Sequence, residues 1–231
     1  MKKLILTILC TLPLIAAGQQ VEKLFSIEGT EMYYLMYTPE GYEKSDESFP
    51  LVIFLHGSGE RGKDYELLKV HGPPKNAENP EKHNLPFLIL SPQLNADSPG
   101  WKPDHLSSLL DLVIKDYRVD EDRIYLTGLS MGGHGTWAWA FQEPNRFAAL
   151  APICGRGDPT QAETIKDIPV WVFHGARDRV VILEESQRMV NALSLIDGDV
   201  RFTIYPTLGH LSWDEAYDSG ILYEWFMKQS R

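Results

Sequence analysis

Short apolar runs bounded by polar or turn-forming residues recur along most of the chain. Continuous runs of about four to eight apolar residues are typical of strands that are buried on both faces. The candidate strands, in chain order, are Leu24–Ile27, Met32–Tyr37, Leu51–Leu55, Phe87–Leu90, Ile124–Thr127, Phe147–Ile153, Val170–Phe173 and Phe202–Tyr205. The first two flank Glu28-Gly29-Thr30, which predicts a hairpin.

Apolar residues repeat at helical spacing in the later connections between these runs. The candidate helices are Leu106–Tyr117, Met131–Gln142, Leu183–Leu195 and Ile221–Lys228. Strands that alternate with helices form a mostly parallel sheet. We therefore predict an α/β protein with a mostly parallel, eight-stranded sheet, helices on both faces and the hairpin as an antiparallel edge. Function in such sheets lies at the carboxyl ends of the strands, so the residues that follow each run are the candidates.

The first eighteen residues have the pattern of a secretory signal peptide. Basic residues Lys2 and Lys3 precede a mostly apolar run, Leu4–Ala17, and small residues follow up to Gly18. The run is too short for a comfortable membrane span. We therefore expect a secreted or periplasmic protein whose residues 19–231 form a single domain. An uncleaved anchor, a buried helix and a lipid on Cys10 are the alternatives.

The net charge limits the possible partners, and the cysteine content limits how the fold can be stabilised. The chain has 22 Lys and Arg residues against 32 Asp and Glu residues, and removal of Lys2 and Lys3 would leave a net charge of about −12. An acidic surface repels phosphate groups, so we expect no nucleic acid and no anionic membrane as partners. Without Cys10, Cys154 would be the only cysteine, and the fold would rest on its core alone. These patterns leave the oligomeric state open.

A glycine-rich turn follows the Ile124–Thr127 run and leads directly into a predicted helix. It reads Gly128-Leu129-Ser130-Met131-Gly132-Gly133, and G-x-S-x-G between a strand and a helix is the pattern of a nucleophile elbow. Side chains two positions either side of the serine would collide with neighbouring elements, so glycine is needed there. The turn exposes the serine hydroxyl at a helix N-terminus, where amide groups favour an oxyanion. Ser130 is therefore the candidate nucleophile.

A nucleophilic serine needs a base, and the chain holds seven histidines. The chain order nucleophile, acid, histidine selects His210, which follows the last predicted strand near the C-terminus. The other six histidines have other expected roles. We expect His56 and His174 to hold the loops that follow their strands, and His134 to lie on a helix face that points away from the substrate. The remaining three, His71, His83 and His105, are expected to be exposed to solvent.

The acid that orients His210 should lie between the serine and the histidine in the chain. Asp178 lies on the loop after the Val170–Phe173 run, at the edge of the sheet where Ser130 is expected. Asp158, after the preceding run, is the competitor. We favour Asp178, because the loop after the later strand is the more common acid position in this architecture.

The loop after the Leu51–Leu55 run is the expected source of a second oxyanion donor. It reads His56-Gly57-Ser58-Gly59-Glu60-Arg61-Gly62. We predict the Ser58 and Met131 N–H groups as the oxyanion hole, with Gly59 as the alternative to Ser58. Arg61 either pairs with Glu60 or the sheet edge, or binds an acidic group of the substrate.

Trp101 and Trp213 lie in loops near the predicted site and are candidate substrate contacts, with plain packing as an equal alternative. The long connection from Gly57 to Phe87 is expected to form part of the pocket, and its Pro73-Pro74 pair is expected to break regular structure. The chain holds no phosphate-loop, dinucleotide or metal-ligand motif, so the sequence predicts no cofactor and no metal.

Five segments together resemble one branch of the α/β-hydrolase superfamily. They are L-H-G-S-G-E-R-G at 55–62, G-L-S-M-G-G-H-G-T-W at 128–137, A-P-I-C-G at 151–155, W-V-F-H-G-A-R-D at 171–178 and G-H at 209–210. The branch holds secreted esterases and predicted peptidases close to feruloyl esterases, poly(3-hydroxybutyrate) depolymerases and dienelactone-hydrolase-like proteins. The resemblance implies the α/β-hydrolase fold and triad roles for Ser130, Asp178 and His210. Arg156 departs from the pattern, since a glycine-rich run would be expected after Cys154.

These observations predict a secreted serine esterase that acts on a small-molecule or glycan-linked ester, including esters on plant polysaccharides. A serine peptidase with the same triad is the second candidate. A secreted binding module on an inactive hydrolase scaffold is the third, and the complete set of triad residues argues against it.

Overall fold

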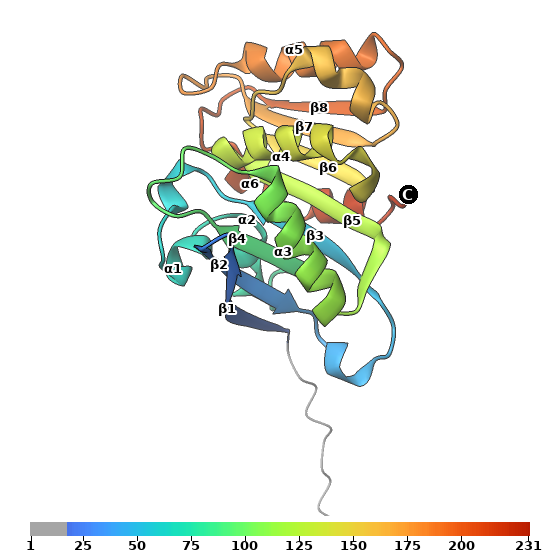
Figure 1. Ribbon diagram of the computed structural model, residues 1–231. Coiled ribbons are helices and arrows are strands. Elements are labelled where there is room, and N and C mark those ends of the chain that lie inside the picture. Colours follow the sequence, from blue (N-terminus) through green and yellow to red (C-terminus); the bar gives the residue numbers. More distant parts are fainter. Residues whose placement is uncertain (1–17) are drawn as a thin grey trace, which may run out of the picture.

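A single twisted sheet of eight strands runs through the middle of the protein, with helices on both of its faces (Figure 1). The computed structural model describes residues 18–231, so the predicted signal peptide lies outside the described residues except for Gly18. The strands are β1 (Gln19–Ile27), β2 (Thr30–Thr38), β3 (Phe49–Leu55), β4 (Leu88–Gln93), β5 (Val119–Leu129), β6 (Ala149–Ile153), β7 (Val170–Gly175) and β8 (Val200–Tyr205). Every predicted strand is present, and the predicted fold class is confirmed.

The strands lie in the order β1-β2-β4-β3-β5-β6-β7-β8. β3 to β8 are parallel, whereas β1 and β2 are antiparallel to their neighbours and form the predicted edge hairpin. The hairpin turn is one residue shorter than predicted, because Ile27 pairs directly with Thr30. Glu28 and Gly29 make the turn with φ of 49° and 75°, the left-handed conformation that suits the twist of a two-residue hairpin.

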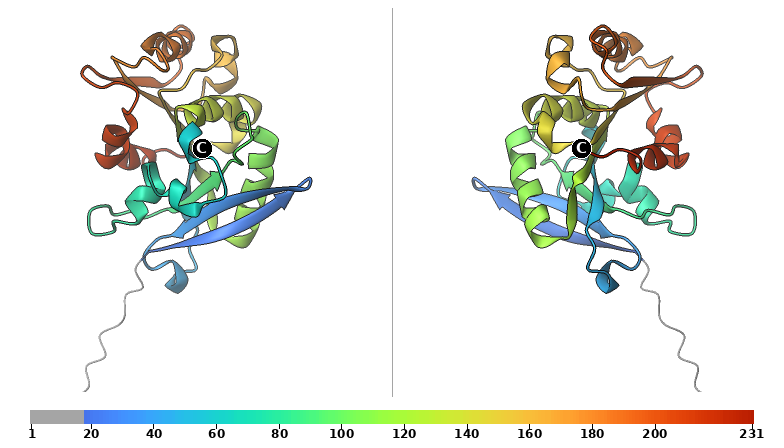
Figure 2. Two further views of the ribbon diagram at one scale, coloured as in Figure 1. Left: turned by 90° about the vertical axis from the view of Figure 1, so that its left-hand side faces the viewer. Right: turned by 90° about the vertical axis from the view of Figure 1, so that its right-hand side faces the viewer.

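Two layers of helices cover the sheet, and Figure 2 shows them on opposite sides. The helices are α1 (Tyr65–Leu68), α2 (Gly72–Ala77), α3 (Pro103–Asp116), α4 (Met131–Gln142), α5 (Leu183–Ser194), α6 (Trp213–Asp218) and α7 (Ile221–Phe226). α3, α4 and α5 contribute to one core, and α2, α6 and α7 to the other. Leu51, Ile53 and Leu55 of β3 point into the first core and Val52 and Phe54 into the second, as period-two alternation requires.

Three helices differ from the sequence prediction. Pro73 and Pro74 were expected to break regular structure, but they stand in the first turn of α2. Amide groups in a first turn have no acceptor within the helix, so proline costs no hydrogen bond there. α1 and α6 are only four and six residues long, too short for a periodic pattern to reveal them.

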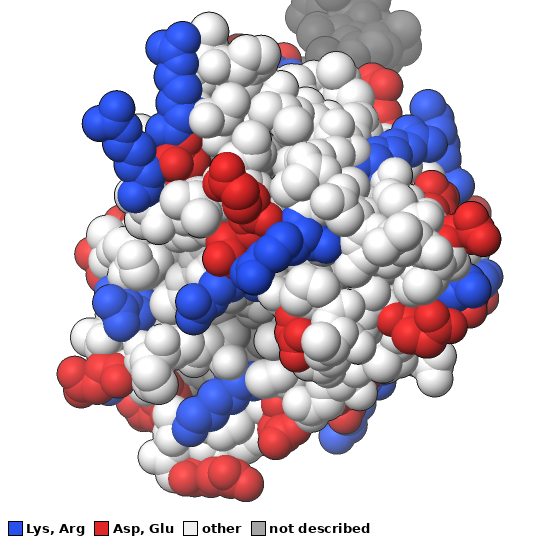
Figure 3. Space-filling model, turned by 90° about the horizontal axis from the view of Figure 1, so that it is seen from above, with Lys and Arg blue, Asp and Glu red and all other residues white. Residues whose placement is uncertain are grey.

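Two properties of the described residues bear on possible partners. Basic and acidic side chains are interspersed on the face seen from above, so the negative net charge does not gather there into one patch (Figure 3). Among the helices formed by residues 18–231, none has the length and apolar content needed to span a bilayer.

The backbone of α4 approaches the end of β3 more closely than any side chain would allow. A Cβ atom on Gly132 would lie 1.8 Å from the carbonyl oxygen of Leu55, and one on Gly128 would lie 2.4 Å from the carbonyl oxygen of Gly132. Neither obstacle is a flexible side chain, so neither can move aside without moving the backbone. The two glycines of the G-x-S-x-G pattern are therefore required by packing, as predicted.

We expect Gly132→Ala to lower the free energy of unfolding by about 3 kcal/mol or more, because the added methyl group displaces backbone. Gly100→Ala is the matched control, since a Cβ atom there meets nothing within 4 Å, and it should change stability by less than about 0.5 kcal/mol. Urea denaturation of both variants measures the difference. Equal midpoints for Gly132→Ala and the wild type would contradict the close backbone approach.

Candidate active site

Ser130 lies at the sharp turn between β5 and α4. Its φ of 52° and ψ of −112° lie outside the conformations that residues with a side chain normally adopt. The Ser130 N–H donates to the carbonyl of Ile153 at 2.9 Å, which ties the turn to the end of the neighbouring strand. Backbone strain of this kind costs on the order of 1–3 kcal/mol and persists only where the surroundings enforce it. The turn has the shape expected of a nucleophile elbow.

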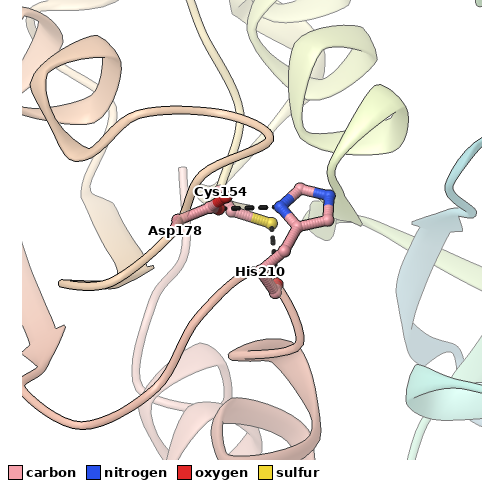
Figure 4. A group of neighbouring side chains, drawn as sticks. All are labelled: Cys154, Asp178 and His210. Carbon is pink, nitrogen blue, oxygen red and sulfur yellow. Dashed lines mark hydrogen bonds and ion pairs between the residues drawn. The ribbon is translucent and has the colours of Figure 1, made fainter.

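The structure brings Ser130, His210 and Asp178 together in one hydrogen-bonded line. Ser130 Oγ lies 2.9 Å from His210 Nε2. On the other side of the ring, His210 Nδ1 lies 2.7 Å from Asp178 Oδ2, and Figure 4 shows this second contact. With the imidazole proton on Nδ1, that nitrogen donates to the carboxylate and Nε2 accepts from the serine hydroxyl. The three residues come from three different connections, after β5, β7 and β8. The parallel strands bring these connections to the same edge of the sheet.

Asp178 is held rigidly and remains ionised. Its side chain is fully buried, and its Oδ1 accepts the N–H groups of Val180 at 2.8 Å and Val181 at 3.0 Å. Burial alone would raise the pKa of this carboxyl, but the hydrogen bonds from His210, Val180 and Val181 outweigh it and leave the pKa below its ordinary value. The carboxylate therefore keeps its charge for interaction with His210.

His174 braces the loop that carries Asp178, as the sequence predicts. Its Nε2 lies 2.9 Å from the carbonyl of Val181 and 3.3 Å from Asp178 Oδ2, and its Nδ1 lies 2.7 Å from the Ser186 hydroxyl. His56 does the same for the loop after β3, where its Nε2 accepts the N–H of Leu94 at 3.0 Å. Both imidazoles are fully buried, and both support the loops rather than face the site.

Trp213 packs directly against His210. The two rings meet edge to face with centroids 5.1 Å apart, and Trp213 Nε1 donates to His71 Nδ1 at 3.2 Å. Trp213 is only 5% exposed, so it offers little surface to a substrate. The structure therefore gives it a positioning role for His210 in place of the predicted substrate contact. His71, which was expected in solvent, is its hydrogen-bond partner.

The proposed oxyanion donors lie on two backbones that touch each other. Met131 is the first residue of α4, and amide groups in a first helical turn have no acceptor within the helix. Ser58 begins a single 3₁₀ turn, Ser58–Glu60, beside Gly57, whose N–H donates to Glu60 Oε2 at 2.8 Å. A Cβ atom on Gly57 would lie 2.7 Å from Leu129 Cδ1, so this loop is in contact with the residue that precedes Ser130. The arrangement suits Ser58 and Met131 as a pair of donors.

Arg61 and Trp101 do not face the site as substrate contacts would. Arg61 donates to the carbonyls of Ser58 and Ser98, both at 3.0 Å, and so joins two loops. It forms no ion pair with Glu60, and it does not border the cavity beside Ser130. Trp101 is 9% exposed, and its Nε1 donates to the carbonyl of His56 at 3.3 Å. Hydrogen bonds to backbone carbonyls hold both side chains, and the sequence contained no signal for the long-range contacts.

His134 lies beside the site, contrary to the expectation that it points away. It borders the same cavity as Ser130, together with Arg156. The Arg156 N–H donates to His134 Nδ1 at 2.7 Å. Asp158, the competitor for the acid role, instead accepts hydrogen bonds from Thr160 and Gln161 at the start of a 3₁₀ helix, Pro159–Ile165. Among the described residues, Asp178 is therefore the carboxylate that contacts His210.

Cys154, Asp178 and His210 are the one group of potential metal ligands that lie close together within residues 18–231, with atoms within 4.8 Å (Figure 4). The Cys154 Sγ donates weakly to the His210 carbonyl at 3.8 Å. Burial raises the pKa of this thiol to about 12, so it stays protonated at neutral pH. The carboxylate and imidazole already bind each other. The group is better suited to proton transfer than to holding a cation.

Comparison with known proteins identifies the family to which the chain belongs. The sequence model of the dienelactone hydrolase family matches residues 102–218, half of the chain, and this segment contains Ser130, Asp178 and His210. The chain belongs to the dienelactone hydrolase family. This dienelactone hydrolase family member is 27% identical over 138 residues to a bifunctional acetylxylan esterase/xylanase from Neocallimastix patriciarum, with 57% of this chain and 20% of that protein aligned.

Solved structures similar to this family member include two esterases. A thermostable esterase is 34% identical with a TM-score of 0.77, and the match covers 92% of this chain and 63% of that chain. A ferulic acid esterase is 19% identical with a TM-score of 0.65, and the match covers 90% of this chain and 96% of that chain, which shows a shared fold. The chain spans less than two thirds of the Neocallimastix patriciarum protein and of the thermostable esterase.

A buried histidine and a partly buried one make the stability of this family member depend on pH. Burial lowers the pKa of both His56 and His134 to about 4, and the charges of Arg61 and Arg156 respectively lower it further. In the unfolded chain these groups titrate near the ordinary pKa of about 6.5. The unfolded state therefore binds more protons between about pH 6.5 and pH 4. The stabilisation from the neutral rings is complete above that range and decreases as the pH falls through it.

We expect the melting temperature to fall as the pH is lowered from about 7.5 to about 4.5, and to fall less in His134→Asn. The asparagine Oδ1 can accept the Arg156 N–H in place of Nδ1, but asparagine does not titrate. Thermal unfolding of both proteins across this range measures the difference. Parallel pH profiles for the two proteins would show that His134 has no lowered pKa.

Proposed function

We propose that this protein is a secreted serine hydrolase that cleaves carboxylic esters through Ser130, His210 and Asp178. The observation that carries the proposal is the unbroken line of hydrogen bonds, 2.9 Å from Ser130 Oγ to His210 Nε2 and 2.7 Å from His210 Nδ1 to Asp178 Oδ2. A serine hydroxyl is a weak nucleophile until a neighbouring base takes its proton, and this line provides the base and a group that orients it.

In the first half of the proposed reaction, Ser130 Oγ attacks the ester carbonyl while His210 Nε2 takes the hydroxyl proton. The negative charge that develops on the carbonyl oxygen is stabilised by the Met131 and Ser58 N–H groups. Asp178, which stays ionised, stabilises the imidazolium. His210 then gives the proton to the leaving alkoxide, and an acyl group remains on Ser130.

In the second half, water replaces the alcohol as the nucleophile. His210 takes a proton from the water as it attacks the acyl carbonyl, and the same two amides stabilise the second oxyanion. The intermediate collapses with transfer of the proton back to Ser130 Oγ, which releases the carboxylic acid. Every proton moves between His210 and an oxygen atom, so the cycle needs no cofactor.

Two arguments favour an ester over an amide as the substrate. The similar proteins include an acetylxylan esterase and a thermostable esterase by name. Amide cleavage also requires recognition of the leaving amine, and among the described residues we identify no group placed for that recognition beside Ser130. A serine peptidase with the same triad is the alternative. An ester on a plant polysaccharide is the substrate class we favour, by likeness to the acetylxylan esterase.

We expect Ser130→Ala to lose about 10⁴-fold or more of the hydrolysis of a 4-nitrophenyl ester, because the nucleophile is gone. Ser194→Ala is the matched control, since Ser194 is exposed at the end of α5, and it should keep wild-type activity. Turnover by Ser130→Ala close to that of the wild type would refute the assignment.

The same assay separates the alternatives when each ester is paired with its matching amide. Faster cleavage of the amides would support a peptidase. Failure of the folded wild-type protein to react with a fluorophosphonate probe would support a binding module without catalysis.

We also propose that residues 1–18 direct export and are then removed. The support is the sequence pattern of Lys2, Lys3, the apolar run and the small residues before Gln19. N-terminal sequencing of the protein recovered outside the cytoplasm should find a chain that begins close to Gln19. A full-length chain retained in the cytoplasm would refute the proposal.

A further inference from the structure

The peptide unit between Gly57 and Ser58 carries one of the two proposed oxyanion donors. The Ser58 N–H opens the 3₁₀ turn, and an amide in that position has no acceptor within the turn. The same peptide unit contains the Gly57 carbonyl, which points opposite to the N–H because the peptide is planar and trans. A group that holds the Gly57 carbonyl therefore also sets the direction of the Ser58 N–H.

Two side chains hold Gly57, one at each of its backbone polar groups. His56 Nε2 accepts the Leu94 N–H, so the ring proton lies on Nδ1, which donates to the Gly57 carbonyl at 2.5 Å. Burial lowers the pKa of His56 to about 4, so the neutral ring keeps this arrangement at ordinary pH. On the other side, the Gly57 N–H donates to Glu60 Oε2 at 2.8 Å. A rotation of the Gly57 backbone would break one or both of these bonds.

Glu60 is itself fixed to the end of β4. Its carbonyl accepts from Gln93 Nε2 at 2.9 Å, and the same amide group donates to the Asp64 carbonyl at 2.8 Å. The Gln93 side chain is buried, and the Glu60 side chain is only 13% exposed. A carboxylate with so little access to water is costly unless it accepts hydrogen bonds within the protein. The bond to the Gly57 N–H supplies one, so the carboxylate and the loop hold each other.

The second oxygen of Glu60 faces the side of the site that carries the base. Glu60 Oε1 lies 4.0 Å from His71 Nε2, and His71 Nδ1 accepts the indole N–H of Trp213, which packs against His210. A separation of 4.0 Å is too long for a hydrogen bond, whereas the 2.8 Å bond to the Gly57 N–H has ordinary length. Glu60 can therefore act on the site by two routes, and the distances favour the route through Gly57.

Resting on the proposed function, we propose that Glu60 is a positioning residue for the oxyanion hole. By accepting the Gly57 N–H, it keeps the Ser58 N–H directed at the carbonyl oxygen that becomes charged during the reaction. A donor that has turned or moved stabilises the oxyanion less, because this stabilisation depends on geometry fixed in advance. Arg61 does not compete for the carboxylate, since its donors bind the carbonyls of Ser58 and Ser98.

Three variants of Glu60 separate the role of its acceptor oxygen from the role of its charge. Glu60→Gln keeps an acceptor oxygen at the same distance from the backbone, Glu60→Asp keeps the charge but withdraws the oxygen by one methylene group, and Glu60→Ala removes both. Glu81→Ala is the matched control, because Glu81 is an exposed glutamate in the connection that precedes β4. The measured quantities are kcat and KM for 4-nitrophenyl acetate as a function of pH, and the affinity for an aryl trifluoromethyl ketone.

We expect kcat to fall by about 10- to 100-fold in Glu60→Ala and Glu60→Asp, with KM within about twofold of wild type, because both halves of the reaction use the same donor. Glu60→Gln and Glu81→Ala should stay within about threefold of wild type. The ketone forms a tetrahedral oxyanion adduct with Ser130, so its affinity should fall by the same factor as kcat/KM. The midpoint of the pH profile reports the base and should not move.

Wild-type kinetics in both Glu60→Ala and Glu60→Asp would overturn this inference, and so would an equal loss in Glu60→Gln and Glu60→Ala. A shifted pH profile would also overturn it, because Glu60 would then act on His210 through His71 and Trp213. If Glu60→Ala does not fold, the comparison of Glu60→Asp with Glu60→Gln decides. All of these outcomes leave the proposed function intact, whereas no hydrolysis of the ester by the wild type would overturn the proposed function itself.

Discussion

The close backbone contact between the start of α4 and the end of β3 fixes the position of the candidate nucleophile. Gly132 has no room for a side chain against the Leu55 carbonyl, and Ser130 takes a positive φ in the turn just before it. The strain at Ser130 is tolerated because the two core layers hold β5, β3 and α4 in place. The same contact places the loop after β3 beside the first turn of α4. Both proposed oxyanion donors are thereby positioned by backbone contacts.

Neighbouring side chains and backbone amides hold the proposed acid and base in position. His174 and two amides hold the Asp178 carboxylate, and the Trp213 ring meets the His210 ring edge to face. These contacts are formed before any substrate arrives, so no dipole has to be reoriented when charge develops. A 32-residue separation between Asp178 and His210 is bridged by one 2.7 Å hydrogen bond. Small movements of either loop would lengthen it.

Arg61 and Arg156 illustrate how the surroundings decide what an arginine does. Arg61 has carbonyl acceptors on two loops and thereby joins them. Arg156 has no such acceptor among the described residues, and its side chain is exposed at the border of the cavity that Ser130 also borders. A guanidinium whose donors are satisfied within the protein joins segments of the fold, whereas one without acceptors in the protein remains hydrated at the surface.

The sequence by itself determined the strands and the elbow, because these follow from local periodicity and from glycine at positions without space. It predicted Asp178 and His210 from the chain order of nucleophile, acid and histidine. It predicted that His56 and His174 hold loops, since both stand where a strand ends. The chain alone could not decide that Trp101 is buried, that Arg61 joins two loops, that Trp213 contacts His210, or that His134 borders the site. Each of these depends on contacts between distant segments, such as Trp213 with His71 and Arg61 with Ser98. Such contacts exist only once the sheet has brought its loops to one edge, so only the tertiary structure decided them.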